Sequence, residues 1–294
     1  MRNRAGSSER PGREPGNQSS GRRDEPGSNF GRRVVAESRV EPAPKPPWID
    51  RSQTMNYVVL DTSTDRAAIG VKAGEAVAFA ATSEVPRRHG RDLIPQLEET
   101  MARVGLRPSN VDVVAVGLGP GSYTGLRIGL AAAKTLSYVS GAAIVGLDSL
   151  EAVALNAPPD ALRISVIADA QRGEVYSADF ARESPGSTPI ATTPTRIEPL
   201  SGWASRVEPG TFVIGPGLDS PRIRSALPVG IVVAETAINR PDASKLLALA
   251  VRTFEQGRRD DLWTIEPRYF RRSAAEEQWE AKARTRPGSR DITP

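Results

Sequence analysis

The stretch GLGPGSYTGLRIGL, residues 117–130, decides the fold of this chain. It follows the β-branched run VDVVAV at residues 111–116 and leads into an apolar stretch with helical spacing that ends at Val139. The unit therefore predicts a strand, a glycine turn and a helix. Unpaired N–H groups and the helix dipole at such a helix start favour an anion, so the loop is a candidate phosphate cradle. A tight turn that only needs glycine is the simpler interpretation.

Three loops with known chemistry resemble this stretch, and each fails at one position or more. A P-loop requires lysine after its second glycine, whereas Leu126 follows Gly125. The dinucleotide fingerprint that starts at Gly117 requires glycine where Ser122 stands. A nucleophile elbow requires serine where Tyr123 stands. The stretch is therefore none of the standard catalytic loops.

Length and composition limit the function classes. A chain of 294 residues that is 38% hydrophobic can form two lobes. The absence of cysteine excludes disulfides, zinc-thiolate sites and cysteine nucleophiles, and the single histidine, His89, excludes a multi-histidine metal site. No apolar run approaches the roughly 20 residues that a membrane-spanning helix needs. We therefore expect a cytoplasmic protein with no metal site and no membrane contact.

The basic charge of the chain is concentrated in residues 1–54. This segment holds 11 of the 39 Lys and Arg and 7 of the 35 Asp and Glu, which leaves 28 of each sign in residues 55–294. It is rich in Gly, Pro, Ser and Arg, so we expect a disordered basic extension. Residues 281–294 are expected to form a flexible C-terminal tail. Met55 is an alternative start, and an RNA-contacting role for the extension is a weaker interpretation.

The ordered chain opens with a strand that ends in an acid, Asp61, followed by the hydroxyl-rich turn TST at 62–64 and strands at 66–72 and 75–81. Actin, sugar-kinase and Hsp70-like ATPase lobes begin in a similar way, with the turn facing nucleotide phosphates. Closing a turn is the alternative role of Asp61. Residues 93–104 have apolar side chains at i, i+3 and i+4 spacing, which predicts an amphipathic helix.

A strand at 142–146 precedes a helix capped by Asp148, and Pro158 marks the end of the first lobe. The second lobe then repeats the order of strands and turns that opens the first. Strands at 164–169 and 174–180 repeat the pattern of strand, acid, turn and strand, which suggests an internal duplication. A second glycine turn follows at 215–218, and residues 242–256 predict an amphipathic helix that we assign to the second lobe.

GPGSYTGLRIGL at 119–130 resembles the signature of the TsaB (YeaZ) family, bacterial partner proteins in the synthesis of threonylcarbamoyladenosine on tRNA. Further motifs of that family occur in its order and spacing. They are LDTST (60–64), HGRDLIP (89–95), IVGLDSLEAVA (144–154), DAQRGEVY (169–176) and EPRYFRR (266–272) followed by AAEE (274–277). The resemblance covers about residues 56–280, and only the N-terminal extension departs from it.

The resemblance implies an α/β fold of two actin-like (ASKHA, Hsp70/sugar-kinase-like) lobes, 55–158 and 159–280. It implies a non-catalytic scaffold or dimerisation subunit, with no catalytic residue, that supports threonylcarbamoyl transfer by a TsaD-like subunit to the adenosine next to the tRNA anticodon. The resemblance also implies a TsaE-like ATPase and, indirectly through the complex, tRNA as further partners, and it makes a homodimer possible when the chain is alone. The alternative is an actin-like-fold enzyme, a threonylcarbamoyl transferase or a metallopeptidase.

The resemblance also implies two sets of site residues. The helices at 93–104 and 126–139 would bind the partner, through Leu93, Leu97, Met101, Leu130, Ala131 and Lys134. We therefore expect Leu97→Glu or Met101→Glu to abolish the complex while the monomer stays folded. Candidate nucleotide contacts ring the cleft between the lobes, at Asp61, Ser63, Gly119, Gly121, Ser122, Asp169, Gly215 and Gly217. The chain is expected to hold no cofactor of its own, which leaves ATP or ADP with Mg²⁺ at the complex interface. Arg127 is expected to anchor the loop to an acid such as Asp61.

Overall fold

The computed structural model describes residues 55–81 and 89–271 of the chain. The expected disordered extension 1–54, the C-terminal tail 281–294 and the AAEE motif at 274–277 lie outside the described residues.

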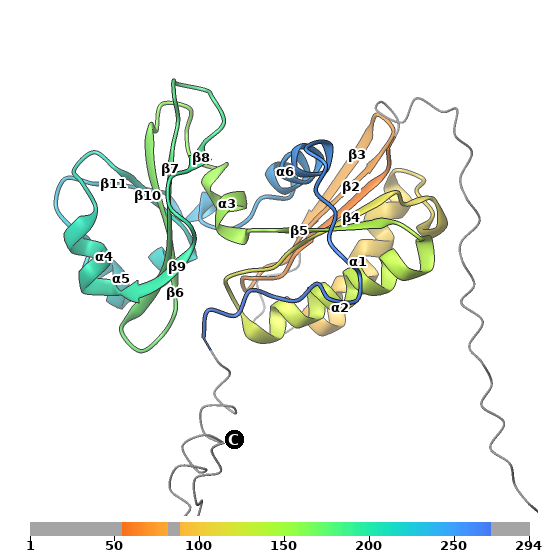
Figure 1. The fold of residues 1–294 in the computed structure, drawn as a ribbon, viewed down its shortest axis with the longest axis horizontal. Helices are drawn as coiled ribbons and strands as arrows, with labels where there is room; N and C mark the ends of the chain where they lie inside the picture. The colour runs from red at the N-terminus through yellow and green to blue at the C-terminus, as the bar shows by residue number, and fades with distance from the viewer. Residues whose placement is uncertain (1–54, 82–88, 272–294) are drawn as a thin grey trace, which may run out of the picture. The chain divides into compact units, whose positions relative to one another are not determined.

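A five-stranded sheet organises the first lobe, in the order β3-β2-β1-β4-β5 (Figure 1). Its strands are β1 (Tyr57–Asp61), β2 (Ala68–Ala73), β3 (Ala76–Ala81), β4 (Val113–Gly117) and β5 (Ala143–Leu147). β1 pairs with β2 in antiparallel and with β4 in parallel, and β5 is parallel to β4. Every residue of β1 and β4 is buried, as expected for central strands that are covered on both faces.

Helices cover both faces of this sheet. α1 (His89–Arg103) and α2 (Tyr123–Ser140) lie on one face, with the short helix η1 (Pro108–Asn110) between them in the chain, and α6 (Ala243–Glu255) lies on the other (Figure 1). The assignment of α6 to the second lobe is therefore wrong, because α6 contacts β1, β2 and β5 and shares a core with Tyr57 and Val59. Its amphipathic pattern predicts a helix but does not say which sheet the apolar face covers.

The second sheet repeats the order of the first. Its order is β11-β10-β6-β7-β8, with β9 paired to β7, so β8-β7-β6-β10-β11 corresponds to β3-β2-β1-β4-β5. The strands are β6 (Arg163–Asp169), β7 (Glu174–Ala181), β8 (Ile190–Ala191), β9 (Arg196–Pro199), β10 (Phe212–Ile214) and β11 (Val232–Val233). The neighbours of β6 have the same directions as those of β1, antiparallel for β7 and parallel for β10. The repeated order supports the internal duplication.

Short helices complete the second lobe. They are α3 (Ser149–Ala154), α4 (Leu200–Arg206), α5 (Pro221–Ser225), η2 (Pro216–Asp219) and η3 (Thr236–Ile238). α3 begins at the Asp148 cap, as predicted, but Leu150 and Val153 pack into the core of the second sheet. α3 precedes residue 158 but packs on the second sheet, and α6 follows residue 158 but packs on the first sheet. We therefore propose residue 158 as a division of the sequence between the two lobes and not of the packing.

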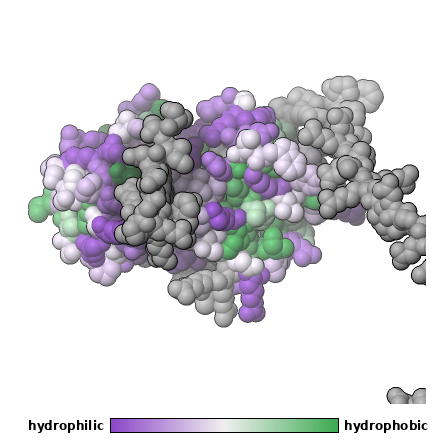
Figure 2. Space-filling view, turned by 60° about the horizontal axis from the view of Figure 1, so that its bottom comes forward, coloured by the Kyte–Doolittle hydropathy of each residue, from purple (hydrophilic) through white to green (hydrophobic). Residues whose placement is uncertain are grey.

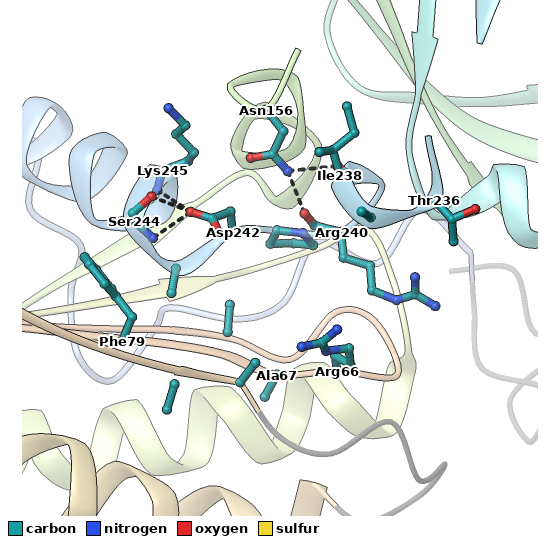
Figure 3. Close-up of a pocket in the computed structure, with 16 residues that line it drawn as sticks. Arg66, Ala67, Phe79, Asn156, Thr236, Ile238, Arg240, Asp242, Ser244 and Lys245 are labelled. Carbon is teal, nitrogen blue, oxygen red and sulfur yellow. Dashed lines mark hydrogen bonds between the residues drawn. The ribbon is translucent and has the colours of Figure 1, made fainter. Parts of the chain in front are cut away.

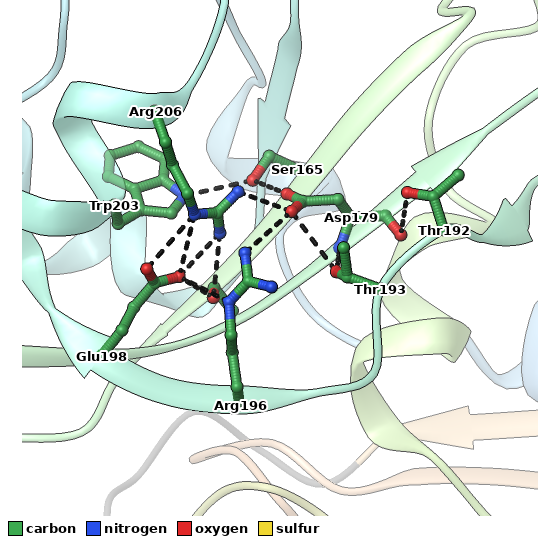
Figure 4. A network of polar contacts seen from close by, with 9 residues as sticks. Ser165, Asp179, Thr192, Thr193, Arg196, Glu198, Trp203 and Arg206 are labelled. Carbon is green, nitrogen blue, oxygen red and sulfur yellow. Dashed lines mark hydrogen bonds and ion pairs between the residues drawn. The ribbon is translucent and has the colours of Figure 1, made fainter.

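An ion-pair network connects α4 and β9 to β7 (Figure 4). Arg206 contacts Asp179 at 2.6 Å and Glu198 at 2.6 Å, and Arg196 contacts the same two acids. The indole N–H of Trp203, which is fully buried, donates to Ser165 at 3.1 Å. Because two arginines face two carboxylates, the network is neutral and its members partner one another.

Candidate functional site

The glycine loop packs against the turn that follows β1. A Cβ atom added at Gly121 would lie 2.2 Å from the Ser63 carbonyl oxygen, and one added at Gly125 would lie 2.1 Å from the Thr62 carbonyl oxygen. The Ser122 N–H donates to the Ser63 carbonyl at 2.7 Å, and the Thr62 hydroxyl donates to the Gly125 carbonyl at 2.7 Å. The space in which a phosphate cradle would hold its ligand is therefore filled by the chain's own turn.

Asp61 lies beneath this contact and is fully buried. Its carboxylate accepts hydrogen bonds from the Ser63 N–H at 2.8 Å and from the hydroxyls of Ser63 and Ser149, each at 2.6 Å. Burial raises the pKa of the Asp61 carboxyl, and the hydrogen bonds from Ser149 and Ser63 oppose this shift. The carboxylate is thus enclosed by protein groups, which favours a structural role.

The expected anchor between Arg127 and Asp61 is wrong. The Arg127 guanidinium lies 4.2 Å from the centre of the Tyr123 ring, and its Nε donates to the Tyr269 hydroxyl at 2.9 Å. The rings of Tyr123 and Tyr269 lie 4.8 Å apart. Arg127 therefore holds residues of the C-terminal segment against α2, and the partners of Asp61 are serines.

The other nucleotide candidates also contact protein groups. The Ser122 hydroxyl caps α2 by accepting from the Gly125 N–H at 3.2 Å. Asp169 accepts from the Gln171 N–H and pairs with Arg222 at 2.7 Å. The Gly119 N–H donates to the Ser149 hydroxyl at 3.2 Å. A Cβ at Gly215 or Gly217 would lie 2.2 or 3.0 Å from the Ile167 carbonyl oxygen. Within residues 55–81 and 89–271, no group of three His, Cys, Asp or Glu side chains is arranged to hold a metal ion.

A cavity of about 650 Å³ lies between the β2–β3 hairpin and the segment from η3 to α6 (Figure 3). Arg240 at its edge pairs with Asp65 at 2.7 Å and with Asp219 at 2.9 Å, and hydrogen bonding to Arg240 lowers the pKa of Asp65. The carboxylate of Asp242 caps α6. None of the eight nucleotide candidates lines this cavity.

An apolar groove of about 770 Å³ runs between α1 and α2. We call it the α1/α2 groove. Its lining consists of Gly90, Leu93, Ile94, Leu97, Glu98, Met101, Ala102, Leu106, Arg107, Pro108, Ile128, Ala131, Ala132, Thr135, Leu136 and Val139. Figure 2 brings this side of the molecule forward and shows hydrophobic residues, in green, gathered near the centre of the view. Ile94 is 54% exposed and Val139 is 64% exposed, so large apolar side chains on this surface face solvent.

The groove contains some of the predicted partner residues but in a different role. Leu93, Leu97 and Met101 are 1%, 6% and 4% exposed and form its floor, as part of the core beneath the sheet. Leu130 is also buried and does not line the groove. Because Leu97→Glu or Met101→Glu would place a charge in the core, this burial argues against the expectation that the monomer stays folded.

Ala131 and Lys134 complete the predicted set. Ala131 is exposed and lines the groove, whereas Lys134 lies outside it and donates to the Trp263 carbonyl at 3.2 Å. The prediction missed the exposed Ile94 and Val139. The available signal was position on the helical wheel, since both are large apolar residues beside the face that a sheet-packed helix buries.

Comparisons with known proteins point to proteins of threonylcarbamoyladenosine synthesis on tRNA. The model of the family described as "TsaD: tRNA N6-adenosine threonylcarbamoyltransferase" matches residues 82–191. The "tRNA threonylcarbamoyladenosine biosynthesis protein TsaB" of Escherichia coli (strain K12) is 26% identical over 234 residues, which cover 75% of this chain and 96% of the relative. The Bacillus subtilis (strain 168) protein of the same name is 26% identical, with 76% and 98% covered.

Two further matches extend this result. An uncharacterized protein of Mycobacterium tuberculosis (strain ATCC 25618 / H37Rv) is 31% identical over 182 residues, which cover 61% of this chain and 80% of that protein. The solved structure of YeaZ from Pseudomonas aeruginosa has a TM-score of 0.64 at 23% identity and covers 74% of this chain and 100% of its own. The chain therefore belongs to the TsaB (YeaZ) family.

Proposed function

We propose that this chain is a non-catalytic subunit in the synthesis of threonylcarbamoyladenosine on tRNA. In this proposal it docks onto a TsaD-like subunit that transfers the threonylcarbamoyl group to the adenosine. The relatives from Escherichia coli and Bacillus subtilis are named for this biosynthesis. The observation that carries the proposal is the α1/α2 groove, because large apolar side chains at a concave, solvent-facing surface are typical of a protein-binding site.

The match to the TsaD family supports a partner of similar shape. Residues 82–191 include the whole of α1 and α2, so we infer that a TsaD-like protein has a corresponding pair of helices. Two such pairs can pack as a four-helix arrangement in which Ile94 and Val139 leave solvent. A second copy of this chain offers the same surface and is the proposed occupant when the TsaD-like subunit is absent. A TsaE-like ATPase and tRNA would join through the complex, in the cytoplasm.

The enclosed turn favours this role over an enzyme that acts by itself. Asp61 is buried with three hydrogen bonds, and Gly121 and Gly125 place backbone against backbone where phosphates would need space. We propose that ATP or ADP with Mg²⁺, if used, binds at the complex interface. Threonylcarbamoyl transfer to tRNA by the purified chain without a TsaD-like subunit would contradict the non-catalytic role.

Val139→Glu in the full chain tests the docking surface. Burying an unpaired carboxylate against a partner costs several kcal/mol, so we expect at least about a hundredfold weaker binding to the TsaD-like protein of the same organism, by titration calorimetry. Because Val139 is 64% exposed, the free energy of unfolding should stay within about 0.5 kcal/mol of wild type.

The matched control is Ile190→Glu. Ile190 is 61% exposed but belongs to β8 in the second sheet, away from the groove. We expect this variant to bind the TsaD-like protein as wild type does. Equal binding by the Val139→Glu and Ile190→Glu variants would contradict the assignment of the groove.

A further inference from the structure

The described chain begins beside one end of the α1/α2 groove. The Asn56 N–H donates to Asp112 at 3.0 Å, and the Asn56 side chain donates to the Asn110 carbonyl at 2.8 Å. Asn110 ends η1, whose first residue, Pro108, lines the groove. The 54 residues that precede Met55 therefore join the described part of the chain at the end of its apolar groove.

The sequence just before this point has the composition of a groove-binding peptide. Pro46-Pro47-Trp48-Ile49 is followed by the polar stretch Asp50-Arg51-Ser52-Gln53-Thr54. Proline-rich segments dock into apolar grooves at a low entropic cost, because proline already restricts the backbone. Trp48 and Ile49 supply two large apolar side chains. The groove offers Ile94, Ile128 and Val139 as surfaces for them.

The connection is long enough for this contact. Seven residue steps separate Ile49 from Asn56, and an extended chain spans about 3.5 Å per step, or about 25 Å in all. α1 has 15 residues, and a rise of 1.5 Å per residue gives a groove wall of about 22 Å. The segment that ends at Ile49 is therefore long enough to lie along the groove from the attachment point at Asn56.

We propose that Pro46–Ile49 docks in the α1/α2 groove of its own chain and competes with the protein partner. This regulation rests on the proposed function of the groove as a docking site. A short tether gives an effective concentration in the millimolar range, so a segment with an intrinsic affinity of about 0.1 mM occupies the groove most of the time and weakens partner binding about tenfold. Only a partner whose affinity for the groove exceeds that of the tethered segment can then displace it.

A disulfide-trapping experiment on the full chain tests the contact without any partner. The chain contains no cysteine, so two introduced cysteines have no competing thiol. Asp50→Cys keeps Trp48 and Ile49 intact, and Ala102→Cys places a thiol on an exposed residue that lines the groove. Under mild oxidation we expect this pair to cross-link within one chain at least about tenfold faster than the control pair, because a disulfide needs Cα atoms within about 7 Å.

The control pairs Asp50→Cys with Glu75→Cys. Glu75 is exposed and follows Gly74, whose N–H donates to the Asn56 side chain at 3.2 Å, so it lies near the attachment point but outside the groove. Adding Trp48→Ser and Ile49→Ser should remove the rate advantage of the Ala102→Cys pair. Equal rates for the two pairs, or an advantage that survives the serine substitutions, would overturn the inference.

Partner binding separates this inference from the proposed function. The full chain with Trp48→Ser and Ile49→Ser should bind the TsaD-like protein about tenfold more tightly than wild type. Unchanged affinity together with a large effect of Val139→Glu would overturn competition by the segment and leave the docking surface supported. No effect of Val139→Glu would instead overturn the proposed function.

Discussion

Gly125→Ala examines whether the glycine loop is a packing device. In an ordinary helix this change stabilises, because alanine exceeds glycine in helix propensity by about 1 kcal/mol. Here the new Cβ would lie 2.1 Å from the Thr62 carbonyl oxygen, a backbone atom that cannot rotate away. Overpacking of this kind costs about 1–3 kcal/mol, and so short a contact points to the upper end. We therefore expect a net loss of about 1–2 kcal/mol.

The matched control is Gly202→Ala. Gly202 lies in α4, is exposed and has no atom within 4 Å of an added Cβ, so the propensity term acts alone. We expect stabilisation of up to about 1 kcal/mol. Urea unfolding of the full-length variants measures both changes, and thermal melting should show shifts of opposite sign, about 2–4 °C per kcal/mol. Stabilisation by Gly125→Ala similar to that by Gly202→Ala would refute close packing of the loop against the β1 turn.

Two further predictions concern the carboxylates. Ser149→Ala removes a hydrogen-bond donor from the buried Asp61 carboxylate, which should raise the pKa of Asp61 further. We expect the free energy of unfolding to fall by about 1–3 kcal/mol, with the larger loss at pH values above this pKa. Urea titrations at several pH values measure the change. Burial alone would raise the pKa of Glu198, but hydrogen bonds from Arg206, Ser177 and Arg196 outweigh it and hold the pKa at about 2. Since this pKa is lowered, its stabilisation is complete above the ordinary value of 4.5 and is lost as pH falls toward 2. Glu198→Gln should flatten the stability curve in that window, and an unchanged acid-unfolding curve would contradict it.

Local chemistry made much of the fold predictable. The strand before residue 117, the glycine turn and the helix after it follow from β-branched residues, glycine and helical periodicity, and α2 runs from Tyr123 to Ser140 as such a pattern predicts. Asp148 and Asp242 cap α3 and α6 because a side-chain carboxylate can accept the free N–H groups of a first turn. These features depend on residues within one or two turns of each other.

Features that depend on distant residues were not predictable in the same way. The apolar face of α6 is evident in the sequence, but its contact with β1 joins residues that lie nearly 200 positions apart. Leu97 and Val139 are both apolar, yet the sheet buries one and leaves the other 64% exposed. Periodicity alone cannot separate a helix face that packs on its own sheet from an adjoining strip that remains for a partner.

The close packing of the loop bears directly on how a partner would be recognised. Gly125 fixes the start of α2 against the β1 turn, while Ala131 and Val139, farther along the same helix, line the open groove. Because the first turn of α2 is held in place, the exposed residues farther along the helix have their geometry set before a partner binds. This lowers the conformational entropy that is lost on association. A phosphate at the same loop would require Gly121 and Gly125 to separate from Ser63 and Thr62. The contacts that enclose the loop therefore favour protein recognition by α2 over ligand binding at its start.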